Sequence, residues 1–596
     1  MSQKTWDLIN ERRNLKIQLA ATTVITESEK ILKRYRTLRK AIYRSSRNDR
    51  RAWADKVADH AQESARHGNL KELYRAARSL TGNNRRKKHP LKDKNGQFIT
   101  TSEGQLKRWG EHFTEVFRQA MTMDNEFPII HHTSVQVLDI NTDIPTHSDV
   151  CETIRNLKDG KVPGADLISA EMLKADLPTA TEILTPLIQR IWQEECVPDE
   201  WRTGLLVTVP KKGNLSNCSN ITLLSIPSKI LCKILLDRLS QAVEPLIRNE
   251  QAGFRPGRSC TDQINTLRII LEQGAEFQRE IYSLFVDFEK AFDTLRWTAI
   301  WSRLEAIGVP LKIINLVKAT YKDYSCRVRH DELISERIAV HSGVRQGCML
   351  SPLLFLILQD LDYADDLCLL SHRRIDMQGK LDDLQREAAA VGLKVNVQKT
   401  KDMRSGARDS GALFIEDEAV GRVSSFTYLG CVVSGTGGTD NDVTSRVAKA
   451  RGAFACLRPV WQSKHLSRRV KLRIFNSNVK TVLLYGCETW KTTKKLWRLC
   501  HEDPVDLQIR RRKWTWIGHT LRRNVNNIPR QALDWNPQGR RKRGRPKQTW
   551  RRSVIAEARD IGKTWSEMKQ AVWSQKFKKK KKKKKKTRFL ARGTIA

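Results

Sequence analysis

The 596-residue sequence has few acidic residues for its many basic ones, and it lacks long apolar runs. Its first residues contain no apolar segment typical of a signal peptide, and no run is long enough to cross a bilayer. The 12 cysteines show no paired spacing, so we expect reduced thiols rather than a disulfide framework. These absences predict a protein of the cytoplasm and nucleus with no membrane partner.

Positive charge is what the sequence has in excess. Lys and Arg number 108 against 66 Asp and Glu, which gives a formal net charge of +42. A basic surface can simply be solvated, but an imbalance of this size is more typical of a nucleic-acid-binding protein. The length allows several domains.

Apolar residues recur at helical spacing in some segments and at strand spacing in others. No regular strand–helix–strand repeat is present, which predicts an α+β fold. The expected elements include a hairpin over 91–99 with Asn95-Gly96 at its turn, a helix over 102–116, a strand over 281–288, a long helix over 373–390 and a short strand over 391–397.

Two short segments carry acids next to apolar residues. In Tyr363-Ala364-Asp365-Asp366 the two adjacent carboxylates lie among apolar residues, and Asp287 ends the apolar run that begins at Ile281. If the two strands pair, their acids meet and can bind Mg²⁺, which prefers carboxylate oxygens. Side chains alternate along a strand, so Asp365 is expected to face Asp287, with Asp366 at the periphery. Taken alone, Asp365-Asp366 fits an exposed turn equally well.

Several motifs together resemble the reverse transcriptases of non-LTR (LINE-like) retrotransposons. The three palm motifs occur in order at 283–293, 343–352 and 363–366. The resemblance covers residues 40 to 575, and it extends to further motifs at 251–258, 392–401, 426–430 and 509–519.

The resemblance implies a right-hand polymerase with fingers, palm and thumb, in which the palm sheet is antiparallel. The expected domains are a helical basic N-terminal extension (1–147), fingers and palm (148–435), a thumb-like helical region (436–500), a basic Trp-rich C-terminal region with an AT-hook-like segment (501–575), and a polylysine and disordered tail (576–596).

The implied activity is RNA-directed DNA synthesis with two Mg²⁺ ions, or Mn²⁺ in their place. One ion activates the attacking hydroxyl and the other supports the leaving pyrophosphate. The family pattern makes Asp287, Asp365 and Asp366 both the catalytic residues and the metal ligands. The implied partners are an RNA template, a DNA primer and deoxynucleoside triphosphates. The oligomeric state is left undetermined.

Other residues match substrate-binding positions of the family. Phe292 resembles the gate that clashes with a ribose 2′-hydroxyl, although a plain core phenylalanine is compatible with that position. Lys399 resembles the lysine that assists pyrophosphate departure. Lys211 and Lys212 would lie in the fingers near the triphosphate, with a solvated turn as the alternative.

Backbone contacts are implied elsewhere. Gly343, Gln346 and Gly347 would let the backbone approach the incoming nucleotide and the template, since glycine tolerates such conformations. Residues 426–430 resemble the primer grip.

The C-terminal region contains Arg543-Gly544-Arg545-Pro546 among further basic residues, which resembles an AT-hook for the narrow A·T minor groove. A nuclear localisation signal and a basic linker are equal alternatives. No zinc is expected, because the spacing of the nearby candidate ligands matches no known zinc motif: Cys487, Cys500, His501 and His519.

The sequence also departs from the family pattern. Residues 218–225 lack a Tyr-Arg pair of the fingers, only a short segment separates Pro352 from Asp365, and 496–504 replaces a family block. No endonuclease domain precedes the motifs, and the lysine run 578–586 resembles translated poly(A), with a functional polybasic tail as the alternative. We therefore expect a truncated, internally deleted copy. The alternative function is a catalytically inactive remnant that only binds nucleic acid.

Overall fold

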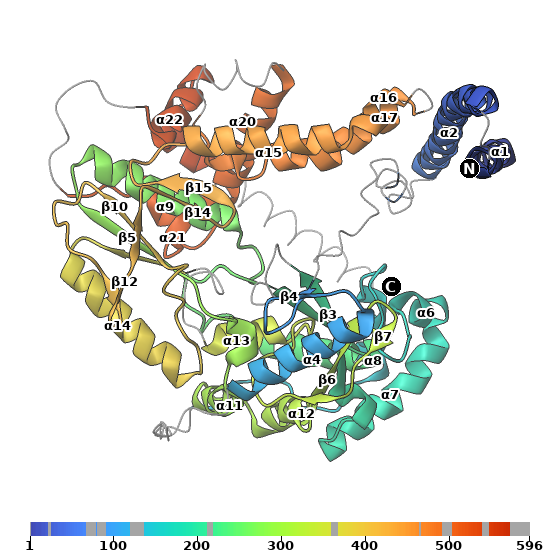
Figure 1. Ribbon diagram of the computed structural model, residues 1–596. Coiled ribbons are helices and arrows are strands. Elements are labelled where there is room, and N and C mark those ends of the chain that lie inside the picture. The colour runs from blue at the N-terminus through green and yellow to red at the C-terminus, as the bar shows by residue number, and fades with distance from the viewer. Residues whose placement is uncertain are drawn as a thin grey trace, which may run out of the picture. The chain divides into compact units, whose positions relative to one another are not determined.

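The computed structural model contains helices and strands in two compact units (Figure 1). The first unit is made of Met1–Lys88 and Val443–Cys487, and the second of His89–Asp442 and Glu488–Ala596. The structure describes residues 2–21, 25–66, 75, 79, 91–119, 136–210, 218–358, 367–463, 466–491, 503–538 and 548–571.

The first unit is helical. Helices α1 (Gln3–Ala21) and α2 (Ile25–Arg66) pack against each other. Thr5 Oγ1 donates to the Asp49 carboxylate at 2.7 Å, which ties the start of α1 to α2. The predicted helical character of the N-terminal segment is therefore confirmed for these residues. The later helices are α15 (Asp440–Cys456), α16 (Arg458–Gln462), α17 (Arg468–Phe475) and α18 (Thr481–Leu483).

The second unit contains a five-stranded sheet. Its order is β4-β3-β6-β7, and β8 also pairs with β6. Helix α4 (Ser102–Gln119) lies against β6 and buries Trp109, Phe113 and Phe117. The strands are β3 (Thr203–Pro210), β4 (Cys218–Leu223), β6 (Ser325–His330), β7 (Leu333–Ile334) and β8 (Ile338–Ala339), and the neighbouring helices are α5 (His147–Asn156), α6 (Ala170–Ala175), α7 (Leu177–Glu194) and α8 (Ile226–Val243).

The unit also contains a four-stranded sheet with the order β13-β10-β5-β9. Strand β5 is antiparallel to both β10 and β9, whereas the edge pair β10–β13 is parallel. All six residues of β5 are buried. The bounds are β5 (Ile281–Val286), β9 (Leu367–Ser371), β10 (Lys401–Ser405) and β13 (Gly421–Val423), and a small hairpin is formed by β11 (Phe414–Ile415) and β12 (Glu418–Ala419).

Alternation along β5 explains its complete burial. Ile281 and Phe285 pack with α9 (Cys260–Glu276), whereas Tyr282 and Leu284 belong to the core that contains α14 (Arg374–Ala390). The two helices lie on opposite sides of the sheet (Figure 1). The sheet is therefore a central layer covered on both faces.

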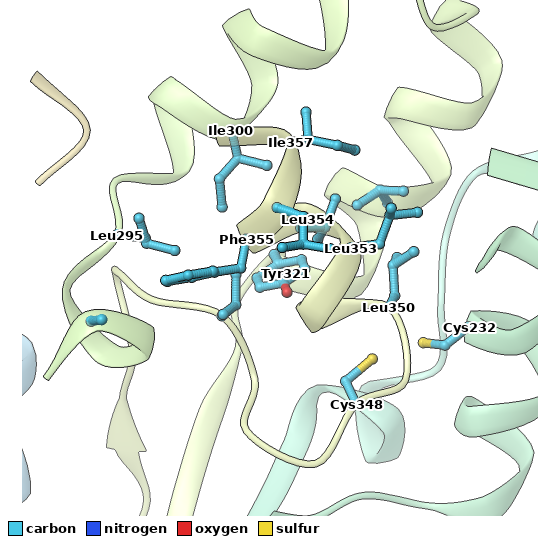
Figure 2. Close-up of a cluster of buried hydrophobic side chains, with 14 of the residues drawn as sticks. Cys232, Leu295, Ile300, Tyr321, Cys348, Leu350, Leu353, Leu354, Phe355 and Ile357 are labelled. Carbon is cyan, nitrogen blue, oxygen red and sulfur yellow. The ribbon is translucent and has the colours of Figure 1, made fainter. Parts of the chain in front are cut away.

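A cluster of buried hydrophobic side chains lies among helices of this unit (Figure 2). Leu354 and Phe355 of α13 (Ser351–Leu358) are fully buried and contact side chains that follow α10. The surrounding helices are α10 (Ala291–Thr294), α11 (Trp297–Ala306) and α12 (Leu311–Tyr321).

Helix α9 also anchors the C-terminal helices. Trp516 Nε1 donates to Asp262 Oδ1 at 2.8 Å, and the Trp550 amide donates to Glu272 Oε2 at 2.8 Å. Ile269 contributes to the apolar part of this junction. The helices are α20 (Asp503–Leu521), α21 (Ile528–Asp534) and α22 (Trp550–Asp560).

Most of the expected elements are found. The hairpin over 91–99 forms from β1 (Leu91–Lys92) and β2 (Phe98–Ile99), and Gly96 has φ +83° at its turn. The long helix expected over 373–390 is α14. Within the described residues, no helix is long and apolar enough to cross a membrane.

The prediction of a strand over 391–397 is wrong. Gly392 has φ +88°, and the Leu393 amide donates to Ala388 O at 2.8 Å, so these residues cap the end of α14. Only Val395 forms a bridge, to Phe288. Because the helix cap uses the first residues of the segment, too few remain to form a strand.

Candidate active site

Asp287 directly follows the last residue of β5, where the chain leaves the covered sheet. The Asn396 amide donates to Asp287 O at 2.8 Å, and the Asp287 amide donates to Thr400 Oγ1 at 3.4 Å. The side chain is 34% exposed. The fold therefore fixes the backbone of Asp287 and leaves its side chain partly exposed, although Oδ2 itself is buried.

The strand pairing predicted for the acidic motifs is confirmed. Val286 of β5 lies opposite Leu367 of β9 in an antiparallel ladder. The residue before Asp287 thus faces the residue after Asp366. Asp365 and Asp366 themselves lie outside the described residues.

Lys399 lies beside Asp287. Its Nζ is 3.0 Å from Asp287 Oδ2, and its side chain is 56% exposed. The Lys399 amide donates to Asn396 Oδ1 at 3.1 Å, and the Thr400 amide donates to Asn396 O at 2.9 Å, so a tight turn holds the lysine. An ion pair this exposed contributes little to stability. It does place a cation next to the predicted metal ligand.

Phe292 of α10 stacks on the buried Phe355 of α13, with ring centroids 4.4 Å apart and an interplanar angle of 9°. Its ring is half-buried. The Phe292 ring therefore packs in the core, as a structural phenylalanine would. It is also partly exposed, as a gate for the incoming sugar requires.

The glycines of the 343–352 motif allow close backbone contacts within the chain. Gly343 has φ +82°, and a Cβ there would lie 2.6 Å from Asp293 O. Gly347 has φ +117°, and a Cβ there would lie 2.2 Å from Thr222 O. The Thr222 amide donates to Gln346 O at 2.6 Å, which fixes the loop against β4. Contact of Gln346 and Gly347 with a nucleotide stays a prediction.

The remaining sequence-predicted residues are not described by the structure. They are Lys211 and Lys212 of the fingers, and Arg543, Gly544, Arg545 and Pro546 of the AT-hook-like segment. Their proposed roles stay predictions.

The expected primer-grip segment forms a hairpin that packs on β5. Strands β14 (Ser425–Tyr428) and β15 (Cys431–Ser434) are joined by Leu429 and Gly430, both at positive φ, as a two-residue hairpin turn requires. Phe426 stacks on Phe285 of β5 at 4.3 Å. The hairpin is thereby attached to the strand that carries Asp287.

Arg345 is a site residue that sequence reasoning missed. It is 3% exposed, and its guanidinium carbon lies 4.9 Å from the Tyr321 ring and 5.4 Å from the Tyr324 ring. A hydrogen bond with Cys232 and the Arg345 charge lower the pKa of Cys348 to about 5. Cys348 and Cys232 lie beside the cluster of Figure 2. The only signal in the sequence was the place of Arg345 between Gly343 and Gly347.

Asp293 is a second missed residue. It lines a small cleft of about 20 Å³ together with Ser342, Arg345 and Gln346. Burial raises the pKa of Asp293 to about 6, against the opposing attraction of Lys290. A carboxyl group with a perturbed pKa next to Phe292 is typical of a functional site.

The described residues contain no cluster of three His, Cys, Asp or Glu side chains that could hold a metal ion. Asp287 fits the role of one ligand, because its oxygens suit Mg²⁺ and its surroundings already accommodate the Lys399 cation. Complete coordination would need the oxygens of Asp365 or Asp366.

Residues 209–433 match the family of reverse transcriptases (RNA-dependent DNA polymerases), and residues 453–485 match a domain of unknown function. The chain is 25% identical to the Transposon TX1 uncharacterized 149 kDa protein of Xenopus laevis, over 64% of this chain and 31% of that protein.

Similar proteins are also found in Drosophila melanogaster. The probable RNA-directed DNA polymerase from transposon X-element is 24% identical over 74% of this chain and 52% of its own length. The Pol polyprotein from type-2 retrotransposable element R2DM is 29% identical over 34% of this chain and 21% of its own length. The chain thus spans between a fifth and a half of the length of these relatives.

Proposed function

Because the chain belongs to the reverse transcriptases of the non-LTR, LINE-like type, we propose that it catalyses RNA-directed DNA synthesis. It would join deoxynucleotides to the 3′ end of a DNA primer on an RNA template. The observation that carries this proposal is the end of β5, where Asp287 lies beside Lys399 and opposite the start of β9.

The polymerase regions can be assigned to the two sheets. We assign the five-stranded sheet and its helices to the fingers, the four-stranded sheet to the palm, and the helices within 436–500 to the thumb. The support for the palm is the antiparallel pairing of β5 with β9 and β10, in which Val286, just before Asp287, lies opposite Leu367 at the start of β9.

Asp287 would share two Mg²⁺ ions with Asp365 and Asp366. The bound ions would activate the primer hydroxyl and stabilise the negative charge of the leaving pyrophosphate. Phe292 would exclude a ribose 2′-hydroxyl by steric contact, since Phe355 prevents its ring from moving back. The Lys399 ammonium would leave Asp287 and neutralise the pyrophosphate.

Primer extension on an RNA template with Mg²⁺ tests this function. The wild-type chain should extend the primer and Asp365→Asn should not. Asp383→Asn is the matched control, because Asp383 is an exposed aspartate whose partner is Arg386 on the same helix. A folded wild-type chain that extends no primer would overturn the proposal.

The second candidate is a remnant that binds nucleic acid without catalysis. The net charge of +42 favours binding whether or not the acids assemble. Affinity should then fall steeply with salt, because bound phosphates release counterions. Tight, salt-sensitive binding without extension would support this candidate, whereas a salt-independent affinity would contradict it.

A further inference from the structure

Phe254 lies in the loop between α8 and α9 and has an unusual conformation. Its ring is 60% exposed, and its backbone φ is +54°. A bulky residue rarely adopts a positive φ, because its Cβ approaches the backbone. Such strain persists only where the surroundings enforce it, and it is concentrated at functional sites. The exposed ring gains little burial in return.

The loop around Phe254 is held by its neighbour Arg255, which is 7% exposed. The Arg255 guanidinium contacts Glu244 Oε1 through Nε at 3.1 Å and through Nη2 at 2.9 Å, and it donates to Gln251 O at 2.9 Å. The Gly253 amide donates to Gln251 Oε1 at 2.7 Å. The residues on both sides of Phe254 are therefore fixed, and the ring is displayed from a rigid loop.

The displayed ring adjoins the predicted gate. The ring centroids of Phe254 and Phe292 are 6.4 Å apart, and the two planes are nearly perpendicular at 85°. Phe292 is in turn stacked on Phe355. The perpendicular contact covers only part of Phe254, so aromatic surface remains accessible beside the site.

The same loop region contains guanidinium groups, two of which are paired with carboxylates: Arg255 with Glu244 and Arg523 with Asp262. Burial and the nearby Arg255 and Arg523 guanidiniums lower the pKa of Arg258. Arg523 also donates to Gly257 O at 2.7 Å. The Arg258 guanidinium can attract a phosphate backbone and leave the aromatic ring to contact a base.

We propose that Phe254 stacks on one nucleobase of a bound primer–template, next to Phe292. Every base presents a flat π face, and exposed aromatic side chains in basic surroundings bind such faces without reading sequence. The inference rests on the proposed function for the identity of the nucleic acid. It does not require that the chain catalyse DNA synthesis.

An abasic-site scan tests the stacking. The dissociation constant is measured for RNA–DNA primer–templates that lack one base at successive positions around the primer terminus. The proteins are the wild type, Phe254→Leu, which keeps an apolar side chain, and Phe254→Tyr, which keeps the aromatic face. Phe98→Leu is the matched control, because Phe98 is also 60% exposed.

In the wild type and in Phe254→Tyr, one abasic position should weaken binding roughly tenfold. Phe254→Leu should bind the intact substrate more weakly by a similar factor and should be insensitive to the missing base. Phe98→Leu should behave as the wild type. Equal affinity of Phe254→Leu and wild type, or retained sensitivity of Phe254→Leu to every abasic position, would overturn the stacking role.

Phe254→Gly separates stacking from a structural role. Glycine adopts positive φ without strain, so this variant should unfold at an equal or higher urea concentration while losing the same affinity. A lower unfolding midpoint with unchanged affinity would show that Phe254 is structural. Primer extension is read separately, so its absence would reject the polymerase function and leave the binding result interpretable.

Discussion

Asp287 and Asp442 are carboxylates of the same unit in opposite surroundings. Asp442 is 1% exposed; its Oδ2 lies 2.9 Å from Arg268 Nη2 and accepts from Trp490 Nε1 at 2.8 Å, and its Oδ1 accepts from the Val432 amide at 2.9 Å. Asp287 is 34% exposed and is paired with the Lys399 side chain, which is itself 56% exposed. The carboxylate with saturated hydrogen bonds holds elements together, whereas the partly exposed one can exchange its cation for a substrate-bound ion.

Of the substitutions at the two carboxylates and their neighbours, Asp287→Asn should reduce activity most. Loss of the charge should lower the primer-extension rate on the order of a thousandfold, because electrostatic stabilisation of the transition state is lost. The urea midpoint should stay nearly constant, since the ion pair is exposed. Steady-state extension and denaturation curves measure both quantities. Activity near the wild-type level would remove Asp287 from the site.

Asp442→Ala should show the reverse behaviour in stability. It leaves the buried Arg268 guanidinium without its carboxylate, and breaking a buried pair typically costs about 3–5 kcal/mol. The free energy of unfolding is measured by urea titration. An effect as small as that of Asp287→Asn would mean that burial does not distinguish the two carboxylates.

Lys399→Ala tests whether the cation beside Asp287 assists the reaction. The rate should fall about a hundredfold, as expected for loss of a group that assists a leaving group. Lys399→Arg keeps the charge and should recover part of the rate. Single-turnover extension separates this step from product release, and equal losses in the two variants would argue against a charge-based role.

Phe292→Val should change selectivity more than rate. Removing the ring opens the space beside Phe355, so ribonucleotide incorporation should rise roughly tenfold relative to deoxynucleotide incorporation. Competition assays with both nucleotides give the ratio. An unchanged ratio would leave Phe292 as a core residue only.

Asp293→Asn should have the smallest effect, confined to pH dependence. The pKa of Asp293 is raised to about 6 in the folded chain, so the folded state binds the proton more tightly than the unfolded state. Its contribution to stability is therefore present at low pH and is lost as the pH rises from about 4 to about 6. The variant should flatten this part of the stability profile. Identical profiles would show that the raised pKa has no consequence.

The sequence predicted the parts of the fold that local pattern determines. The largely apolar β5 and the acid after it indicated a buried strand that ends in a site residue, and the pairing with β9 followed from the second acidic motif. Segment 391–397 has apolar residues at strand spacing, yet its first residues cap α14. Alternation alone cannot distinguish these two outcomes, because the cap depends on where the preceding helix ends.

Residues whose role depends on distant partners were harder to predict. Lys399 was assigned by family resemblance, but its contact with Asp287 depends on the turn at Asn396. Arg345 was missed because a basic residue in a loop is usually exposed, and its burial requires Tyr321 and Tyr324 from another part of the chain. The exposure of Phe254 likewise depends on the ion pair between Arg255 and Glu244.

The attachment of the C-terminal helices to α9 has a consequence for synthesis. Asp262 and Trp516, which share a hydrogen bond, are separated by 254 residues. At a translation rate of about 5–20 residues per second, the ribosome needs roughly ten to fifty seconds to reach Trp516 after it has made α9. During that interval Ile269, which is buried in the finished protein, lacks its C-terminal partners. A nascent chain would thus present this face of α9 to chaperones until translation is almost complete.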